Sequence, residues 1–269
     1  MEHMSRQTIA AYRLAYTFPL FDYADESGAI RACIIGSDPF CEEYLKAAVW
    51  STQRDGFRLE LDVFAAKSEC ARLQKLYPEV FCTEGLSDRH EIFCDVRLKS
   101  GAPCGSYGFA MTAGECSALS VNAAKAVIIS DERAHCAKSD ILRFTSQELC
   151  GGDFLAQSGI EKQALSLFCR FGGSAERFFR DEFSYRSSVA SAMFWDIRRR
   201  QGESIEVCER NMRLEHRRWN AFTRTEGYRY GEKRSEQEKT HPCLVSWDML
   251  SAEYRQYDAE PIRNSGLIS

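Results

Sequence analysis

The last quarter of the chain, from Arg213 onward, concentrates aromatic and basic side chains at close spacing. It contains the segments RLEHRRWNAF, GYRYG and KTHPCLVSW in that order. Aromatic rings can stack on a planar ligand and cations can hold its negative charge, whereas a buried core does not need this mixture. The pattern therefore predicts a pocket for a flat, charged small molecule.

Residue spacing indicates which of these side chains share a face. Glu215 and His216 precede Trp219 by four and three residues, so on a helix the three lie on one side. Tyr228 and Tyr230 are two apart in an extended segment, which points both rings the same way. The alternative for any single ring is a place in the core, which is the commoner role of a buried aromatic. The pocket hypothesis therefore depends on the cluster as a whole.

Five short motifs in the same region follow one family's order. They are YRSS at 185–188, EHxxW at 215–219, GYxYG at 227–231, KxHPxLV at 239–245 and WDxL at 247–250. Over about residues 180 to 264 the chain thereby resembles the repeat domain of ryanodine receptors, the Ry (RyR) domain, in its bacterial form. This resemblance implies a binding domain without known catalytic machinery. It also implies a place in nucleotide-centred signalling or antiphage defence, with ADP-ribose relatives or cyclic nucleotides as ligands.

The motifs and the clustering together predict the ligand-binding residues. We expect Trp219, Tyr228 and Tyr230 to stack on the ligand. Cations and polar groups would hold its phosphates or polar edge. The full expected set is Arg186, Ser187, Glu215, His216, Trp219, Tyr228, Tyr230, Arg234, Lys239, His241 and Trp247.

The first part of the chain alternates apolar runs of strand length with helical patterns, which predicts an α/β fold with a mostly parallel sheet. The expected strands are 30–35, 57–64, 80–82, 91–97, 126–130 and, as the last, 163–171; the expected helices follow Pro39, cover 67–76 and begin at Asp131. Residues 99–114 are expected to form a loop. The pair Gly172-Gly173 is the candidate boundary, giving an α/β domain over 1–173 and a mainly helical RyR domain over 174–269. In that second domain we expect helices opened by Ser188 and Ser204, and a short one after Ser251.

The segment IIGSDPFCEEYL resembles the first strand, turn and helix of a Rossmann-type domain, such as that of Trk-type potassium-transport regulators. The fingerprint GxGxxG falls on Gly36, Asp38 and Cys41, so only its first glycine is present. A carboxylate at Asp38 would repel a pyrophosphate, and Asp62 lies two residues too early for the acid that binds a ribose. We therefore expect no dinucleotide cofactor, and a fold kept as a scaffold, a dimer interface or a pocket for another ligand.

Composition narrows the class of protein. A formal net charge of −4 on 269 residues argues against a general nucleic-acid binder. No apolar run reaches the roughly 18 residues of a membrane helix, and the N-terminus does not read as a secretory signal, so we expect a cytoplasmic protein. The twelve cysteines include no CxxC pair, which favours reduced, mostly buried thiols such as Cys33, Cys94 and Cys169. The alternative is a zinc site built from Cys82, His90, Cys94 and Cys104.

Two other functions remain open from the sequence. One is a nucleotide-processing enzyme working at the strand ends, with Asp38 or Asp131 as the acidic group. The other is an interaction subunit that docks an effector protein, and a homo-oligomer is compatible with either. His135 and Cys136 are adjacent on an expected helix, so their side chains diverge and do not form a nucleophile–base pair.

Overall fold

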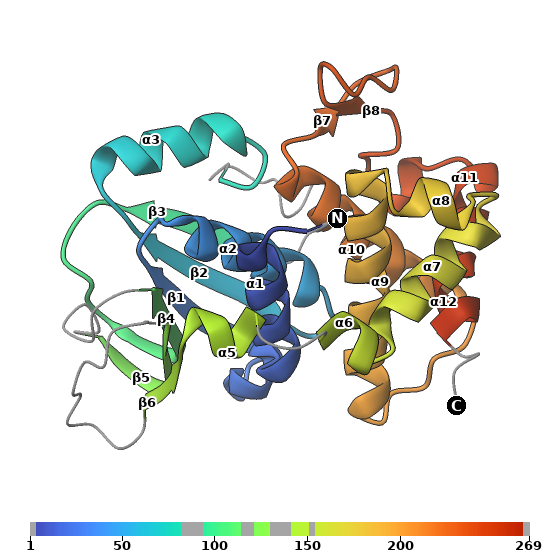
Figure 1. Ribbon diagram of the computed structural model, residues 1–269. Coiled ribbons are helices and arrows are strands. Elements are labelled where there is room, and N and C mark those ends of the chain that lie inside the picture. Colours follow the sequence, from blue (N-terminus) through green and yellow to red (C-terminus); the bar gives the residue numbers. More distant parts are fainter. Residues whose placement is uncertain (1–3, 82–93, 114–120, 130–140, 151–153, 266–269) are drawn as a thin grey trace.

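The computed structural model describes residues 4–81, 94–113, 121–129, 141–150 and 154–265. An α/β half is followed by a helical half packed beside it (Figure 1). One cluster of buried apolar side chains runs through both halves, from Ile30 and Phe109 in the sheet to Phe222 and Ile262 near the C-terminus. The two halves therefore share a core.

The α/β half contains a sheet of six parallel strands in the order β3-β2-β1-β4-β5-β6. The strands are β1 Ala29–Ile35, β2 Arg58–Phe64, β3 Cys94–Lys99, β4 Ser106–Ala113, β5 Asn122–Ile129 and β6 Ile141–Phe144. This is the strand order of the Rossmann fold, in which the chain crosses over between β3 and β4. The predicted fold class is confirmed.

The second helix of this half is buried on nearly every side. The helices that the structure describes in this half are α1 Arg6–Thr17, α2 Pro39–Ser51, α3 Lys67–Leu76 and α5 Ser146–Cys150, with a short 3-10 turn at Leu20–Tyr23. One side of α2 packs on β1 and β4, and the other sides meet α1, α9 and α10. Ten of its thirteen residues are buried, although it carries Glu42, Glu43 and Lys46. Trp50 and Ala47 on α2 are both fully buried.

The helical half begins with α6 Phe154–Gln157 and α7 Ile160–Arg170. It continues with α8 Ala175–Phe178, α9 Glu182–Arg200, α10 Glu209–Thr225, the strand pair β7 Arg229–Tyr230 and β8 Thr240–His241, a 3-10 turn at Trp247–Met249, α11 Ala252–Tyr257 and α12 Ala259–Ser265. Helix α7 packs against α9 and α12. Gly172, just after α7, has φ +80, a conformation that glycine adopts without strain. The domain boundary at Gly172-Gly173 stays a prediction.

Several expected elements agree with the structure. The strands at 30–35 and 57–64 correspond to β1 and β2, the helix over 67–76 is α3, and the helix after Pro39 is α2. Ser251 caps α11 by accepting a hydrogen bond from the backbone of Tyr254. Some expected elements lie outside the described residues. They are the helix from Asp131 and, within the expected strands, Cys82, residues 91–93 and residue 130.

Two expectations about the sheet are wrong. Residues 163–170 belong to helix α7 and Phe171 is its C-cap, because the buried positions Ile160, Ala164, Leu167 and Phe168 recur at helical spacing. The expected loop at 99–114 contains β4, a central strand. Its small residues fit close packing, since a Cβ on Gly108 would lie 2.4 Å from the carbonyl oxygen of Tyr23.

Smaller corrections concern helix starts and local assignments. Helix α9 begins at Glu182 with Asp181 as its cap, six residues before the expected Ser188, and α10 begins at Glu209 rather than Ser204. Val80 and Phe81 are not in a strand. Cys169 is exposed on α7, whereas Cys33 is buried in β1 as expected.

Candidate ligand-binding site

A cavity of about 390 Å³ lies in the helical half, bounded by α7, α9, α10, the segment around β8 and α11. Its volume falls within the roughly 300–1,000 Å³ of small-molecule sites. Seven of the eleven predicted site residues line it: Ser187, Glu215, His216, Trp219, Tyr228, Arg234 and His241. The structure therefore brings most of the predicted cluster to one place.

Aromatic rings form one wall of this cavity. Trp219 on α10 is half-buried, and the ring of His241 meets it edge-on with centroids 4.9 Å apart. Tyr228 packs against Phe183 of α9 at 5.2 Å. Such partly exposed rings leave a face available for a planar guest.

His241 is neutral at physiological pH. Burial and the nearby charge of Arg234 lower its pKa to about 4. Its Nδ1 accepts a hydrogen bond from the backbone N–H of Cys243 at 3.1 Å, so the ring proton of the neutral form is carried on Nε2. His241 therefore contributes a donor without a charge.

A buried ion pair forms the floor of the cavity. The side chains of Glu215 and Arg218 are each 2% exposed, and Arg218 Nη2 donates to Glu215 at 2.7 Å. The same carboxylate accepts from Trp195 Nε1 at 2.7 Å and from the Ser191 hydroxyl at 3.1 Å. Glu215 is thus fully satisfied, whereas the Nη1 of Arg218 has no hydrogen-bond partner within the described ranges.

His216 joins the floor to the C-terminal segments. Its Nδ1 lies 3.3 Å from the carboxylate of Asp258, and its Nε2 lies 2.9 Å from the carbonyl oxygen of Val245. Burial raises the pKa of Asp258, and the hydrogen bond from His216 opposes that shift. These contacts fix the loop after β8 and the last helices against α10.

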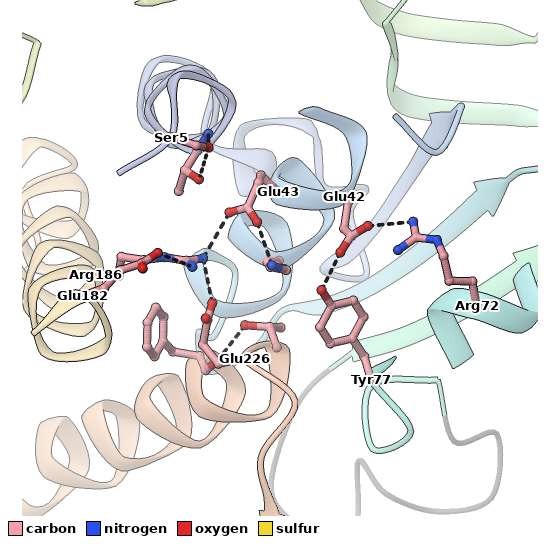
Figure 2. Close-up of polar contacts among 12 residues, drawn as sticks. Ser5, Glu42, Glu43, Arg72, Tyr77, Glu182, Arg186 and Glu226 are labelled. Atoms are coloured by element: carbon pink, nitrogen blue, oxygen red, sulfur yellow. Dashed lines mark hydrogen bonds and ion pairs between the residues drawn. The ribbon is translucent and has the colours of Figure 1, made fainter. Parts of the chain in front are cut away.

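Arg186 lies away from the cavity. It is buried where α9, α2 and the end of α10 meet, with Nη2 3.1 Å from Glu43 and 2.8 Å from Glu226. Figure 2 shows the guanidinium in contact with these two carboxylates. The Arg186 side chain points toward α2, whereas the next residue, Ser187, faces the cavity. Arg186 therefore connects the two halves and does not contact the cavity.

Three further predicted residues also lie elsewhere. Lys239 donates to the carbonyl oxygen of Glu226, and Trp247 is 1% exposed with the guanidinium groups of Arg213 and Arg255 over its ring. Tyr230 is 50% exposed outside the cavity. It does not share the direction of Tyr228, because the extended strand β7 begins only at residue 229.

The comparisons with known proteins address the C-terminal segment. The RyR domain family model matches residues 202–266. The chain carries a C-terminal RyR domain. No curated protein and no solved structure matches the chain. The sheet order supports a Rossmann-like α/β half, but the resemblance of that half to Trk-type regulators is not confirmed.

The cavity extends beyond the matched segment. Helices α7 and α9 precede residue 202, yet they supply Phe168, Phe183 and Ser187 to the lining. The RyR domain therefore forms only part of the site, and the preceding helices complete it.

Sequence reasoning missed some of the lining. Arg218 follows Glu215 by three residues, a spacing at which opposite charges meet on a helix, so the pair was recognisable. Tyr254 and Tyr257 also line the cavity and are spaced by three on α11, with ring centroids 6.1 Å apart. That spacing on a capped helix was the available signal.

The edge of the sheet at the carboxyl ends of the strands, where a dinucleotide fold binds its ligand, is arranged differently from the cavity. Asp38 caps α2, and its Oδ1 accepts from the backbone N–H groups of Phe40 at 2.8 Å and Cys41 at 3.3 Å. In a dinucleotide fold these helix-terminal donors face the pyrophosphate. Here the chain's own carboxylate occupies them.

Asp62, the other acidic group considered, is also fully engaged. It is buried and bonds Lys99 at 2.6 Å, Tyr107 at 2.7 Å and Arg97 at 2.8 Å. Burial would raise its pKa, but these three donors outweigh burial and lower it. Asp62 therefore ties β2 to β3 and β4. Asp131, His135 and Cys136 lie outside the described residues.

A nucleophilic cysteine and a metal site are two alternatives that the described residues allow us to examine. Burial and the charge of Asp258 raise the pKa of Cys243, the thiol lining the cavity, which is the opposite of an activated nucleophile. Where the chain is described, no three His, Cys, Asp or Glu side chains are grouped to hold a metal ion. Cys82 and His90 of the zinc alternative are not among those residues.

None of the described helices is long and apolar enough to cross a bilayer.

Proposed function

We propose that the RyR domain cavity binds a nucleotide-derived small molecule, either an ADP-ribose-like compound or a cyclic nucleotide messenger. On this proposal the protein is a cytoplasmic sensor in bacterial signalling or antiphage defence. The eight cysteines whose side chains the structure describes are free, in keeping with a reducing compartment. The RyR match supports a binding or sensing role in general.

One observation carries the proposal: the rings of Trp219, Tyr228 and His241 line the same cavity as the guanidinium of Arg234. Stacking of a base on an aromatic side chain contributes about 1–3 kcal/mol, and every base offers a π face. Arg234 is 60% exposed, and its partner Glu236 lies at 3.5 Å, so it can hold a phosphate at the mouth. Together these groups suit a planar, anionic ligand.

A sensor also needs a connection to the rest of the molecule, and two helices provide one. On α9, Ser187 lines the cavity while the adjacent Arg186 pairs with Glu43 of α2. Glu226, at the end of α10, binds the same guanidinium two residues before Tyr228. We propose that ligand binding biases the packing of α9 and α10 against α2 through this junction (Figure 2).

Titration calorimetry of the whole chain against ADP-ribose and a set of cyclic nucleotides tests the binding proposal. The matched variants are Tyr228→Ala, inside the cavity, and Tyr230→Ala, exposed two residues away. Loss of one stacking ring should lower the affinity for a bound ligand by about tenfold. Tyr230→Ala should change it by less than about twofold.

The proposal fails if no compound of the set binds to the folded protein. It also fails if both tyrosine variants weaken binding equally, because the cavity would then not be the place of binding.

A further inference from the structure

Within the proposed function, on which this inference rests, we infer that the ligand enters with its planar ring first. Arg218 at the floor donates to an uncharged acceptor on the ring edge, and Arg234 at the mouth holds the phosphate. The ligand class is a nucleotide whose base presents an acceptor remote from the sugar, such as a purine ring carbonyl or ring nitrogen. Arg218 is then a specificity-determining residue.

The floor offers an unmet hydrogen-bond donor. Arg218 directs Nε and Nη2 to Glu215, while its buried Nη1 has no partner in the part of the chain that the structure describes. A buried donor without a partner is unfavourable, so a ligand acceptor that reaches it is bound selectively. Arg218 lines the cavity, and a ligand acceptor reaches Nη1, which is screened from solvent, when the side chains around it shift.

The charge of the floor disfavours a phosphate. The guanidinium of Arg218 is already shared with Glu215, and the carboxylate of Asp258 lines the same cavity. A phosphate brought there would lose its water and lie beside acidic groups without a free cation. An uncharged ring edge has neither cost, since it needs one donor and no counter-charge.

The mouth has the opposite character. Arg234 lines the cavity but is 60% exposed, and its partner Glu236 is 77% exposed and at 3.5 Å. A phosphate can remain largely hydrated there and exchange with Glu236 for the guanidinium. The cavity volume of about 390 Å³ lies at the lower end of the usual range, which favours one base with its sugar inside and the phosphate outside.

Ligand-observed saturation-transfer NMR on the whole chain tests the orientation. The probes are AMP, GMP, adenosine, guanosine and ribose 5-phosphate. We expect the base protons of the nucleotides to receive the strongest transfer, the nucleosides to bind, and ribose 5-phosphate to bind at least about tenfold more weakly than the nucleotides. Stronger transfer to the sugar-phosphate end, or ribose 5-phosphate binding as tightly as the nucleotides, would overturn the ring-first orientation.

Two variants separate the two ends of the ligand. Arg234→Gln should weaken nucleotides by about three- to tenfold and leave nucleosides unchanged, because an exposed charge pair contributes little and acts only on the phosphate. Arg218→Lys keeps a positive charge beside Glu215 but loses the planar second donor. It should weaken nucleosides and nucleotides alike by about tenfold. Arg229→Gln, which alters an exposed strand residue outside the cavity, is the matched control.

The outcomes distinguish this inference from the function on which it rests. If Arg218→Lys weakens only the phosphorylated probes, the phosphate lies at the floor and the inference is wrong while the binding function stands. If neither these probes nor the ADP-ribose and cyclic nucleotide set bind, the proposed function fails and the inference with it. If Arg218→Lys does not fold, as circular dichroism would show, the transfer pattern and Arg234→Gln still decide the orientation.

Discussion

The sheet edge and the RyR cavity both place a carboxylate beside hydrogen-bond donors, but they differ in what remains free. At the edge, Asp38 accepts from two backbone N–H groups at the start of α2, the donors that a phosphate would need. In the cavity, Glu215 is satisfied by its neighbours and still leaves Nη1 of Arg218 without a partner among the described residues. The Rossmann-like strand order would place a ligand at the sheet edge, whereas the hydrogen-bond donor without a partner lies in the cavity. Function depends on the chemical groups of a site rather than on the fold that carries them.

The same contrast explains the role of α2. In a dinucleotide-binding protein the N-terminus of this helix binds the phosphates, and its backbone N–H groups are left free for them. Here it is capped, and its length is buried between the sheet and the helices α9 and α10. Glu43 on α2 receives Arg186 from α9. The helix has become a structural connection between the halves.

The largest effect on the free energy of unfolding is expected from removal of the Glu215 carboxylate at the floor of the cavity. Glu215→Ala leaves the buried guanidinium of Arg218 without its counter-charge, and Trp195 and Ser191 without their acceptor. Removal of one partner from a buried ion pair costs about 3–5 kcal/mol of the free energy of unfolding. Urea unfolding followed by circular dichroism measures the loss.

The matched control is Glu236→Ala, whose carboxylate is 77% exposed beside Arg234. It should change the free energy of unfolding by no more than about 0.5 kcal/mol. Equal effects of the two variants would show that the floor of the cavity is not the buried network described above.

A smaller effect is expected at the sheet edge. Asp38→Ala removes the N-cap of α2 and should lower the free energy of unfolding by about 1 kcal/mol, while Asp38→Gly should cost only a few tenths. Neither should change the affinity of a ligand bound in the RyR cavity by more than about twofold. A marked gain in anion affinity on Asp38→Gly would contradict the comparison, because it would show that the edge can still bind a phosphate once the carboxylate is gone.

The strand and helix pattern of residues 30–76 was predictable because each element there has its own local signal, whereas helix α1 was not predicted. Alternating Leu59, Leu61 and Val63 mark β2, and Asp38-Pro39 marks the start of α2. The strand β4 was missed because its small residues, including Gly108, reflect packing against Tyr23, a contact distant in sequence. The strand expected at 163–171 is wrong because the helical period of α7 is evident only over its full span, Ile160–Arg170.

The site was predicted in part, because spacing fixes faces of a helix but not partners across the fold. Glu215, His216 and Trp219 on α10 were grouped as the spacing indicates. Arg186 was assigned to the ligand by its motif, yet its charge is taken by Glu43, a residue 143 positions away in the other half. No local pattern carries that information.

The smallest expected effect is a pH dependence carried by His241, which lines the cavity and has no counterpart at the sheet edge. Burial and Arg234 lower its pKa to about 4, below the ordinary value of 6.5. Between pH 6.5 and 4 the unfolded chain therefore binds a proton that the folded chain does not, so this residue makes the free energy of unfolding fall as the pH falls. The imidazole is partly exposed, and solvent screening keeps the contribution modest.

His241→Asn removes the titrating group. Its urea unfolding midpoint should fall less steeply than that of the unmodified protein between pH 6.5 and 4.5, and parallel profiles would show that His241 is not held neutral by its surroundings.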